Sequence, residues 1–418
     1  MSSGMRNQVV FSAIDRFEHG GRLVAIASAM TFCVLVTLLG GCGERQSEGP
    51  TPGVTETEIL LGSSSALEGH ASFLGTQYTR GSQAYFDEVN AAGGIHGRQV
   101  RLVALDDGYD PPRTVANTKR LIEVDRVFML FGYVGTPTSV RVIEDVHEAA
   151  TPAFGFFTGA EALRTPFRPQ MFHVRASYYA EAEGAVSYFV DRLGLRNLAV
   201  MYQDDAFGHA VLTGIQLALH RREMGLSSIG TYERGTMAVD RAAATIASSN
   251  AEAVLMVGTY APLARFVKLS HERGFEPYFH TVSFVGSEAF ARELRDVQEV
   301  DSAQYERIIV TQVVPSPLAD GLEAVTEYRR LAEKHYPEDP LNYVALEGFV
   351  NARVLVEILR RAGPDLTRAK LIQTIEDLRD FDAGIGQTVG YGRVDHKGLD
   401  AVFYSRLQED GTFRTFTP

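Results

Sequence analysis

Hydroxyl side chains gather where two predicted strands of this sequence end. Thr136, Thr138 and Ser139 stand in the loop Gly135–Ser139, and Thr158 follows the next apolar run. The loop precedes residues with helical spacing, and a helix N-terminus offers unpaired N–H groups and the positive end of a dipole. Together with the hydroxyls, these groups could hold a carboxylate or another anion. The alternative is that Thr138 or Ser139 only caps the helix and the other residues shape a turn.

Clusters of acidic residues favour structural roles over catalysis or metal binding. Asp204 and Asp205 are adjacent, and neighbours in sequence rarely converge on one substrate, so we interpret them as a loop and a helix cap. The turn Asp106–Pro111 holds three carboxylates, but its spacing differs from an EF-hand loop and no glutamate closes it. We find neither G-x-S-x-G nor a strand-linked G-x-G-x-x-G, and we predict no enzyme activity, no cofactor and no metal site.

The hydroxyl loop lies between two apolar runs, Val127–Gly132 and Pro152–Phe157. Each run suits a strand that is buried on both faces. Between them Val140, Ile143 and Val146 recur at helical spacing, so the sequence predicts one helix joining two parallel strands. Ligands of open α/β sheets bind beyond the carboxyl ends of the strands, which is where the hydroxyl loop would lie.

Strand and helix patterns alternate from Glu58 to the end of the chain, and the alternation runs twice. This predicts an α/β fold with two lobes, in which helices cover parallel-rich sheets. Among its elements we expect a helix at Thr76–Ala92 after a loop and a strand at His173–Tyr179. Residues Ala401–Leu407 and Thr412–Phe416 should form a terminal hairpin.

The composition is that of a soluble globular protein and excludes one class of partner. The 418 residues suffice for two lobes, with 45% hydrophobic and 22% charged residues. The chain has 40 basic and 52 acidic residues, giving a formal net charge of −12. Nucleic-acid binding needs a basic face, and no basic cluster with interleaved aromatic residues occurs, so we predict no nucleic-acid partner.

The first residues predict a targeting segment. An apolar run ends in Leu39–Cys42 (Leu-Gly-Gly-Cys), which resembles a bacterial lipobox. We therefore predict a lipoprotein signal peptide at 1–41, a lipidated Cys42, and a flexible tether over 42–57 that places the protein in the periplasm or cell envelope. The alternative is an uncleaved anchor, because the run nearly reaches membrane-spanning length. Cys33 falls inside the signal, so the mature chain would form no internal disulfide.

Several blocks are similar, in order, to the motifs of one family. The block Asn90–Arg98 (Asn-Ala-Ala-Gly-Gly-Ile-His-Gly-Arg), followed by Asp106-Asp107 and Asp110-Pro111, resembles the opening of the type I periplasmic binding proteins. These are the Leu/Ile/Val-binding-protein-like receptors of ABC importers, and the resemblance covers about residues 57–418. Weaker matches in the same order are Gly132–Thr138, Tyr202–Gly208, Gly258–Tyr260, Val285-Gly286 and Asp395–Gly398.

The resemblance implies two Rossmann-like lobes that close over a solute by a hinge motion. Three crossovers would join the lobes, near 176–178, 312–315 and 396–400. The implied division gives lobe 1 residues 58–177 and 313–397, and gives lobe 2 residues 178–312 and 398–418.

The resemblance also implies which residues touch the solute. The hydroxyls would hold a carboxylate, and Phe207 and Tyr260 would supply aromatic walls. The implied ligand-binding set is Thr136, Thr138, Ser139, Thr158, Phe157, Phe207, Tyr260, Tyr178 and Leu74. Amino-acid-binding members place an acidic residue for the ligand's ammonium near Ser283-Phe284, where this chain has none. The ligand is therefore expected to be a carboxylate or amide with an apolar body rather than an ordinary α-amino acid.

These features lead us to expect a monomeric, extracytoplasmic solute-binding lipoprotein. It would capture a small amino-acid-like, carboxylate or amide solute and deliver it to the permease subunits of an ABC importer. One alternative is a ligand-sensing receptor that feeds a signalling partner. A further alternative, which fits the motifs less well, is a secreted α/β enzyme.

Overall fold

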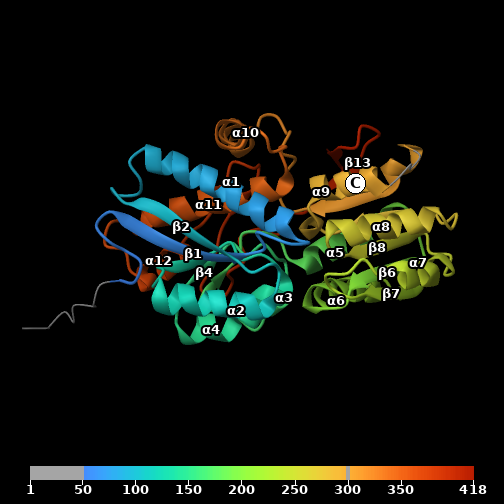
Figure 1. Ribbon diagram of the computed structural model, residues 1–418, viewed down its shortest axis with the longest axis horizontal. Coiled ribbons are helices and arrows are strands. Elements are labelled where there is room, and N and C mark those ends of the chain that lie inside the picture. The colour runs from blue at the N-terminus through green and yellow to red at the C-terminus, as the bar shows by residue number, and fades with distance from the viewer. Residues whose placement is uncertain (1–50, 298–301) are drawn as a thin grey trace, which may run out of the picture. The chain divides into compact units, whose positions relative to one another are not determined.

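The computed structural model describes residues 51–297 and 302–418. Two large β-sheets with associated helices make up most of this part of the chain (Figure 1). The predicted signal peptide, Cys42 and part of the predicted tether lie outside the described residues. Within the described ranges, no helix combines the length and the apolar character that a membrane span requires.

The first sheet has five strands, all parallel, in the order β2-β1-β3-β4-β5. The strands are β1 (Glu58–Ser65), β2 (Gln99–Asp106), β3 (Met129–Phe131), β4 (Ala153–Phe154) and β5 (Met171–Phe172). Its helices are α1 (Ser72–Ala91), α2 (Pro111–Lys119), α3 (Thr136–Arg141), α4 (Ile143–Glu148), α10 (Glu323–His335), α11 (Tyr343–Ala362) and α12 (Arg368–Glu376). Helices α1 and α11 lie on one face and α2 and α4 on the other, so both faces of the central strands are buried (Figure 1).

The second sheet has seven strands in the order β14-β13-β10-β9-β8-β6-β7. The strands are β6 (Leu198–Gln203), β7 (Ser228–Tyr232), β8 (Ala253–Val257), β9 (Tyr278–Thr281), β10 (Ile308–Gln312), β13 (Phe403–Leu407) and β14 (Phe413–Phe416). Its helices are α5 (Tyr178–Val186), α6 (Ala206–His220), α7 (Asp240–Ala247), α8 (Tyr260–His271) and α9 (Ser287–Val297). Five strands are parallel, and only the terminal hairpin β13–β14 runs antiparallel.

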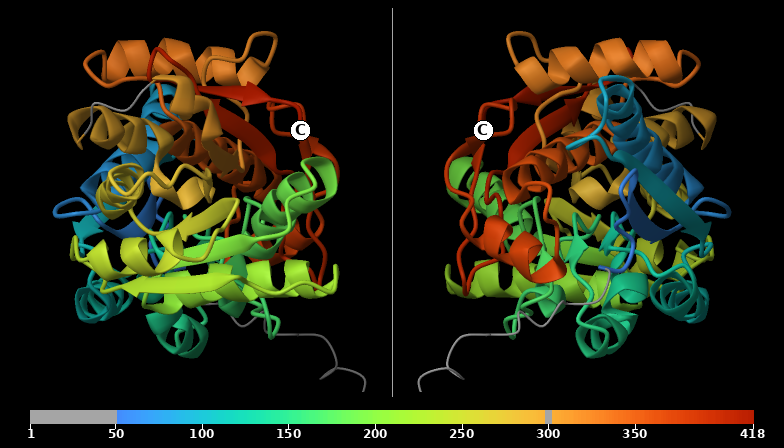
Figure 2. Two further views of the ribbon diagram at one scale, coloured as in Figure 1. Left: turned by 90° about the vertical axis from the view of Figure 1, so that its right-hand side faces the viewer. Right: turned by 90° about the vertical axis from the view of Figure 1, so that its left-hand side faces the viewer.

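The terminal hairpin closes one edge of the second sheet. It is dark red in Figure 2 and lies beside the green segment that contains α5. Tyr188, which follows α5, contacts Tyr404 and Phe416 of the hairpin at ring distances of 6.1 and 5.6 Å. The last residues of the chain therefore complete a sheet whose other strands precede them by about a hundred residues or more.

The chain passes between the two sheets three times. The passages follow β5, β10 and the small hairpin of β11 (Phe381–Asp382) and β12 (Thr388–Val389). Two of the passages run side by side, since the His173 N–H donates to the His396 carbonyl at 2.9 Å. The Gly398 N–H donates in turn to the His173 carbonyl at 2.7 Å.

The predicted α/β class with two parallel-rich sheets is confirmed, and three details were wrong. Helix α1 begins at Ser72 rather than Thr76, because Leu74 is fully buried against the rest of the fold. The helix expected after the hydroxyl loop is divided at Val142, whose φ of −106° and ψ of 9° are not helical. No strand spans His173–Tyr179, because β5 ends at Phe172 and Ser177 caps α5 by accepting a hydrogen bond from the Ala180 N–H.

Candidate functional site

Side chains that follow the carboxyl ends of strands in both sheets meet one another. Tyr109 follows β2, Phe157 follows β4 and Phe284 follows β9. The Phe284 ring lies 6.0 Å from that of Tyr109 and 5.4 Å from that of Phe157. The site therefore forms where an open α/β sheet ordinarily binds its ligand, with one wall from each sheet.

Three hydroxyl groups converge on the first-sheet side of this site. The Oγ1 atoms of Thr136 and Thr158 lie 2.6 Å apart, and both side chains are fully buried. Burial raises the pKa of the Tyr178 hydroxyl to about 12, while Arg175 and the nearby hydroxyls of Thr158 and Thr136 oppose the shift. The Tyr178 hydroxyl has no hydrogen-bond partner among the described residues. Three of the predicted ligand-binding residues thus present hydroxyls to one point.

Thr138 and Ser139 behave differently from that pair. The Thr138 hydroxyl donates to the carbonyls of Val134 at 2.5 Å and Gly135 at 3.0 Å, so it is committed to its own loop. The Ser139 Oγ is buried and finds no hydrogen-bond partner among the described residues. The capping alternative is wrong for both residues, because the cap position of α3 is Gly135 and no side chain caps it.

Aromatic rings form the other wall, and the structure brings most of the predicted ones together. Phe207 lies 4.7 Å from Phe284 and 5.3 Å from Tyr178, measured between ring centroids. With Phe157 these rings are all fully buried. They make a continuous apolar surface beside the three hydroxyls.

Leu74 and Tyr260 occupy a neighbouring position. Tyr260 packs edge-on against Phe73 at 6.3 Å. A Cβ placed on Gly286, two residues after Phe284, would lie 2.8 Å from a Leu74 methyl group. These contacts join the start of α1 to elements of the second sheet.

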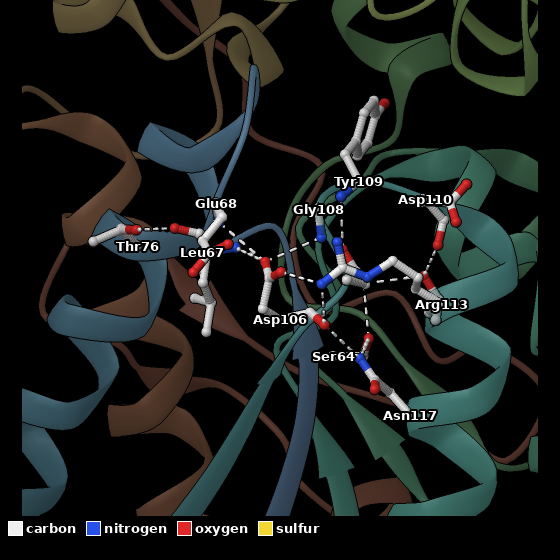
Figure 3. Close-up of polar contacts among 12 residues, drawn as sticks. Ser64, Leu67, Glu68, Thr76, Asp106, Gly108, Tyr109, Asp110, Arg113 and Asn117 are labelled. Carbon is white, nitrogen blue, oxygen red and sulfur yellow. Dashed lines mark hydrogen bonds and ion pairs between the residues drawn. The ribbon is translucent and has the colours of Figure 1, made fainter.

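A polar network after β1 and β2 holds Tyr109 in the site (Figure 3). The buried carboxylate of Asp107 accepts hydrogen bonds from the Ser64 hydroxyl at 2.7 Å, the Tyr109 N–H at 2.9 Å and the Thr114 hydroxyl at 3.0 Å. Burial raises the pKa of Asp107, and these hydrogen bonds oppose the shift. Asp107 therefore fixes the backbone from which the Tyr109 ring extends.

Asp106 organises the same turn from its other side. One of its carboxylate oxygens accepts the N–H groups of Leu67 at 2.9 Å and of Glu68 and Gly108 at 3.0 Å (Figure 3). Partial burial works against ionisation, but these hydrogen bonds and Arg113 hold the pKa of Asp106 below its ordinary value. The acidic turn thus binds backbone N–H groups, and no cluster within the described residues has a metal-binding arrangement.

Sequence reasoning missed Tyr109, although it lies after a strand end. Its backbone has a φ of 63°, which turns the ring toward the second sheet. There Arg234 stacks on the ring at 5.9 Å and donates to the Tyr109 carbonyl at 3.3 Å. The signal was the Asp-Asp-Gly-Tyr turn at the end of β2, which we interpreted only as a turn.

Replacing Gly135 by alanine should destabilise the fold more than the same replacement at a glycine whose only constraint is its positive φ. Gly135 has a φ of 98°, and a Cβ there would lie 2.2 Å from the Tyr109 ring. Gly97 has a φ of 81° and nothing within 4 Å of that position, so Gly97→Ala isolates the backbone strain. We expect about 1–2 kcal/mol for Gly97→Ala and a larger loss for Gly135→Ala in denaturant unfolding. Equal losses of unfolding free energy in the two variants would show that the Tyr109 ring does not pack closely against this turn.

Sequence reasoning also missed a buried charged cluster at the first passage between the sheets. The Arg175 side chain is 1% exposed and lies 3.4 Å from Glu181 and 3.6 Å from Glu347. Its guanidinium stacks on Phe157 at 5.0 Å, and it hydrogen-bonds the Ser283 hydroxyl. Its Nε and Nη1 atoms have no hydrogen-bond partner within the described part of the chain.

The two carboxylates of this cluster differ in how they are satisfied. Glu181 accepts the Ser283 N–H at 2.8 Å, the Ser283 hydroxyl at 2.9 Å and the Thr311 hydroxyl at 2.8 Å. Burial raises the pKa of Glu181, while Arg175 and these hydrogen bonds oppose the shift. Burial raises the pKa of Glu347 to about 7, with Arg175 opposing and Glu181 adding to the shift. A carboxylate therefore lies beside Ser283, but its oxygens are already occupied.

The fold has counterparts among known proteins. Residues 58–412 match a family model described as periplasmic binding protein. A solved structure of a possible leucine/isoleucine/valine-binding protein from Rhodopirellula baltica SH 1 is 32% identical, with a TM-score of 0.81, over 87% of this chain and 97% of that one. A substrate-binding periplasmic protein from Ralstonia solanacearum is 28% identical, with a TM-score of 0.79, over 86% and 100%. Leu/Ile/Val-binding protein homolog 7 of Brucella abortus (strain 2308) is 24% identical over 349 residues, 80% of this chain and 84% of that protein.

Proposed function

We propose, since this chain belongs to the Leu/Ile/Val-binding family of type I periplasmic binding proteins, that it captures a small carboxylate solute with an apolar body for an ABC importer. Members of this family bind solutes and do not convert them. The chain is accordingly a non-enzymatic, extracytoplasmic solute-binding protein of the ABC-transporter class.

The paired hydroxyls are the observation that supports a carboxylate group on the ligand. Thr136 and Thr158 are buried with their Oγ1 atoms 2.6 Å apart, and Tyr178 adds a third hydroxyl. In the pair one hydroxyl donates to the other, and this bond can be exchanged for bonds to an anionic oxygen of the ligand. Hydrogen bonds to charged groups are the stronger ones. The Arg175 guanidinium lies nearby, over the Tyr178 ring at 5.8 Å. Its charge is shared with Glu181 and Glu347, and its Nε has no hydrogen-bond partner among the described residues.

The apolar end of the ligand is assigned to the rings. Phe157, Phe207, Phe284 and Tyr109 meet across the two sheets, and a solute enters by replacing ring–ring contacts with its own. The names of the Rhodopirellula and Brucella relatives refer to leucine, isoleucine and valine, whose branched apolar side chains accompany a carboxylate. A ligand of that shape suits both walls.

An α-ammonium group is not part of the proposal. Glu181 is the carboxylate beside Ser283, and it already accepts three hydrogen bonds and contacts Arg175. A ligand ammonium would have to displace these donors. We therefore favour simple, keto or hydroxy carboxylates over α-amino acids.

We further propose that the two sheets with their helices act as two lobes that close over the solute. The proposed boundaries are 58–177 and 313–397 for lobe 1, and 178–312 and 398–418 for lobe 2. A ligand that contacts both walls favours the closed arrangement, which is the differential contact that hinge closure requires.

Native mass spectrometry of the purified chain tests this function. We expect one small carboxylic acid per chain, released unchanged when the protein is acidified. A screen of carboxylates by thermal shift serves as the second arm if purification removes the ligand. A chain that carries no small molecule and is stabilised by none of the carboxylates would overturn the proposal.

Cys42 is the proposed attachment point to the membrane and lies outside the described residues. We expect Cys42→Ser to move the protein from the membrane fraction to the soluble fraction, or to block processing of residues 1–41. The measurement is cell fractionation together with the mass of the mature N-terminus. An unchanged distribution and an unchanged mass would argue against a lipid anchor at this cysteine.

A further inference from the structure

A cavity of about 270 Å³ lies beside two of the passages between the sheets, and none of the proposed ligand-binding residues lines it. One side is formed by residues around the short helix Glu161–Leu163 and by β5, and the other by residues 394–397. The two sides are tied together by the His173–His396 and Gly398–His173 backbone hydrogen bonds. A molecule held here would touch both passages.

Arg164 supplies a buried positive charge in the wall of this cavity. The residue is 8% exposed, and its Nη2 donates to the Arg175 carbonyl at 3.2 Å. Its Nε and Nη1 find no acceptor among the residues described. Burial lowers its pKa only to about 10, so the guanidinium is charged at neutral pH. Buried donors of a cation are rarely left without an acceptor, and an anion would provide one.

His173 supplies an acceptor beside that cation. Its Nε2 lies 3.2 Å from the Leu163 carbonyl, which can only accept, so Nε2 carries the proton. Burial and the charge of Arg164 hold the pKa of His173 well below its ordinary value, so the ring is neutral. Its Nδ1 is then a buried lone pair, with no donor among the described residues.

The remaining charges of the cavity are mostly positive. Arg168 and Lys397 line it together with one carboxylate, Asp395. Around the cavity, Glu144 lies 3.9 Å from Arg168, and Glu376 lies 3.5 Å from the His396 ring. The charges of Glu161 and Asp400 also act on Arg164, and they raise its pKa against the effect of burial. Three cations therefore line the cavity against one anion.

We propose that this cavity binds a small oxyanion of the phosphate class that carries both charged oxygens and a hydroxyl. Arg164 and Lys397 hold the charged oxygens, and the hydroxyl donates to the Nδ1 of His173. Hydrogen phosphate has this combination, whereas sulfate has no hydroxyl at neutral pH. The bound anion ties residues 394–397 to the segment that contains Arg164 and His173.

Isothermal calorimetry with inorganic phosphate on the full chain, at fixed ionic strength, tests the proposal. We expect saturable one-to-one binding to the wild type and binding about tenfold weaker or more for sulfate. Lys397→Gln should weaken phosphate binding about tenfold, and Arg164→Gln should abolish it. The matched control is Lys370→Gln, which removes the same charge from an exposed position of α12 outside the cavity lining. Arg164 is buried, so its variant can fail to fold. The decisive comparison is therefore between Lys397→Gln, at an exposed position, and Lys370→Gln.

Hydrogen exchange gives an independent readout of the same event. Phosphate should slow exchange of the His173 and Gly398 amides, which join the two walls, in the wild type and not in Lys397→Gln. Equal phosphate affinities of the Lys397→Gln and Lys370→Gln proteins would overturn the site, and equal affinities for sulfate and phosphate would overturn the role of His173.

Vesicles of phosphatidylglycerol test whether the anion is a lipid headgroup instead. Binding to them that depends on Lys397, without binding of inorganic phosphate, would replace the free anion by a lipid headgroup and overturn the proposal.

Discussion

We expect the Arg175→Met protein to lose about 3–5 kcal/mol of its free energy of unfolding, the cost of removing one partner from a buried ion pair. Arg175 and Glu181 are fully buried, and Glu347 nearly so, so water cannot replace the lost guanidinium. The matched control is Arg101→Met, which breaks the exposed pair of Arg101 with Glu58 and should cost at most about 1 kcal/mol. The measurement is urea unfolding of the three proteins at neutral pH.

The loss of unfolding free energy caused by Arg175→Met should depend on pH. The pKa of Glu347 is raised to about 7, above its ordinary value of 4.5, so the folded state binds more protons between those pH values. Stability therefore falls as the pH rises through that window. Without Arg175 the carboxylates become harder to ionise, so the loss should be smaller at pH 5 than at pH 8. A loss that is equal at both pH values, or no larger than that of Arg101→Met, would refute the role of this cluster.

The second large effect concerns the ligand rather than the fold. Thr136→Val and Thr158→Val should each weaken binding of the natural ligand about ten- to hundredfold, the value of one hydrogen bond to a charged group. Thr138→Val is the matched control from the same loop, because its hydroxyl donates to the carbonyls of Val134 and Gly135. It should cost about 0.5–1.5 kcal/mol of stability and leave the affinity unchanged.

Calorimetry with the ligand found by native mass spectrometry separates the three variants. If Thr138→Val weakens binding as much as Thr136→Val, the loop acts through its general shape. If all three bind like the wild type, the hydroxyls do not hold the ligand.

The strands and helices of the fold could be predicted from the spacing of apolar residues over short stretches of the chain. Apolar runs such as Val127–Phe131 are too short for helices and too continuous for half-exposed strands, so they predict the parallel sheet that β3 belongs to. Thr136 and Thr158 could be selected because they follow such runs. The different partners of Thr138 could not be foreseen, because a hydroxyl two residues away on the same helix turns back to its own backbone.

The charged cluster escaped sequence reasoning because its members are far apart in the chain. Arg175 lies in a passage between sheets, Glu181 in α5 and Glu347 in α11, and only the fold brings them together. One signal was present in the sequence. Glu347 interrupts the apolar stretch Val344–Val350 of α11, where a solvent-exposed charge was not to be expected. Asp107 likewise carried a hint, since its turn ends in the tyrosine that enters the site.

We propose that the site selects a carboxylate through paired hydroxyls and does not require an ammonium group. Calorimetry with an apolar carboxylic acid, its primary amide and the corresponding α-amino acid tests this on the wild-type chain. We predict that the acid binds about ten- to hundredfold more tightly than the amide, and at least as tightly as the amino acid. Equal affinities for acid and amide, or binding only of the amino acid, would show that the paired hydroxyls do not select a carboxylate.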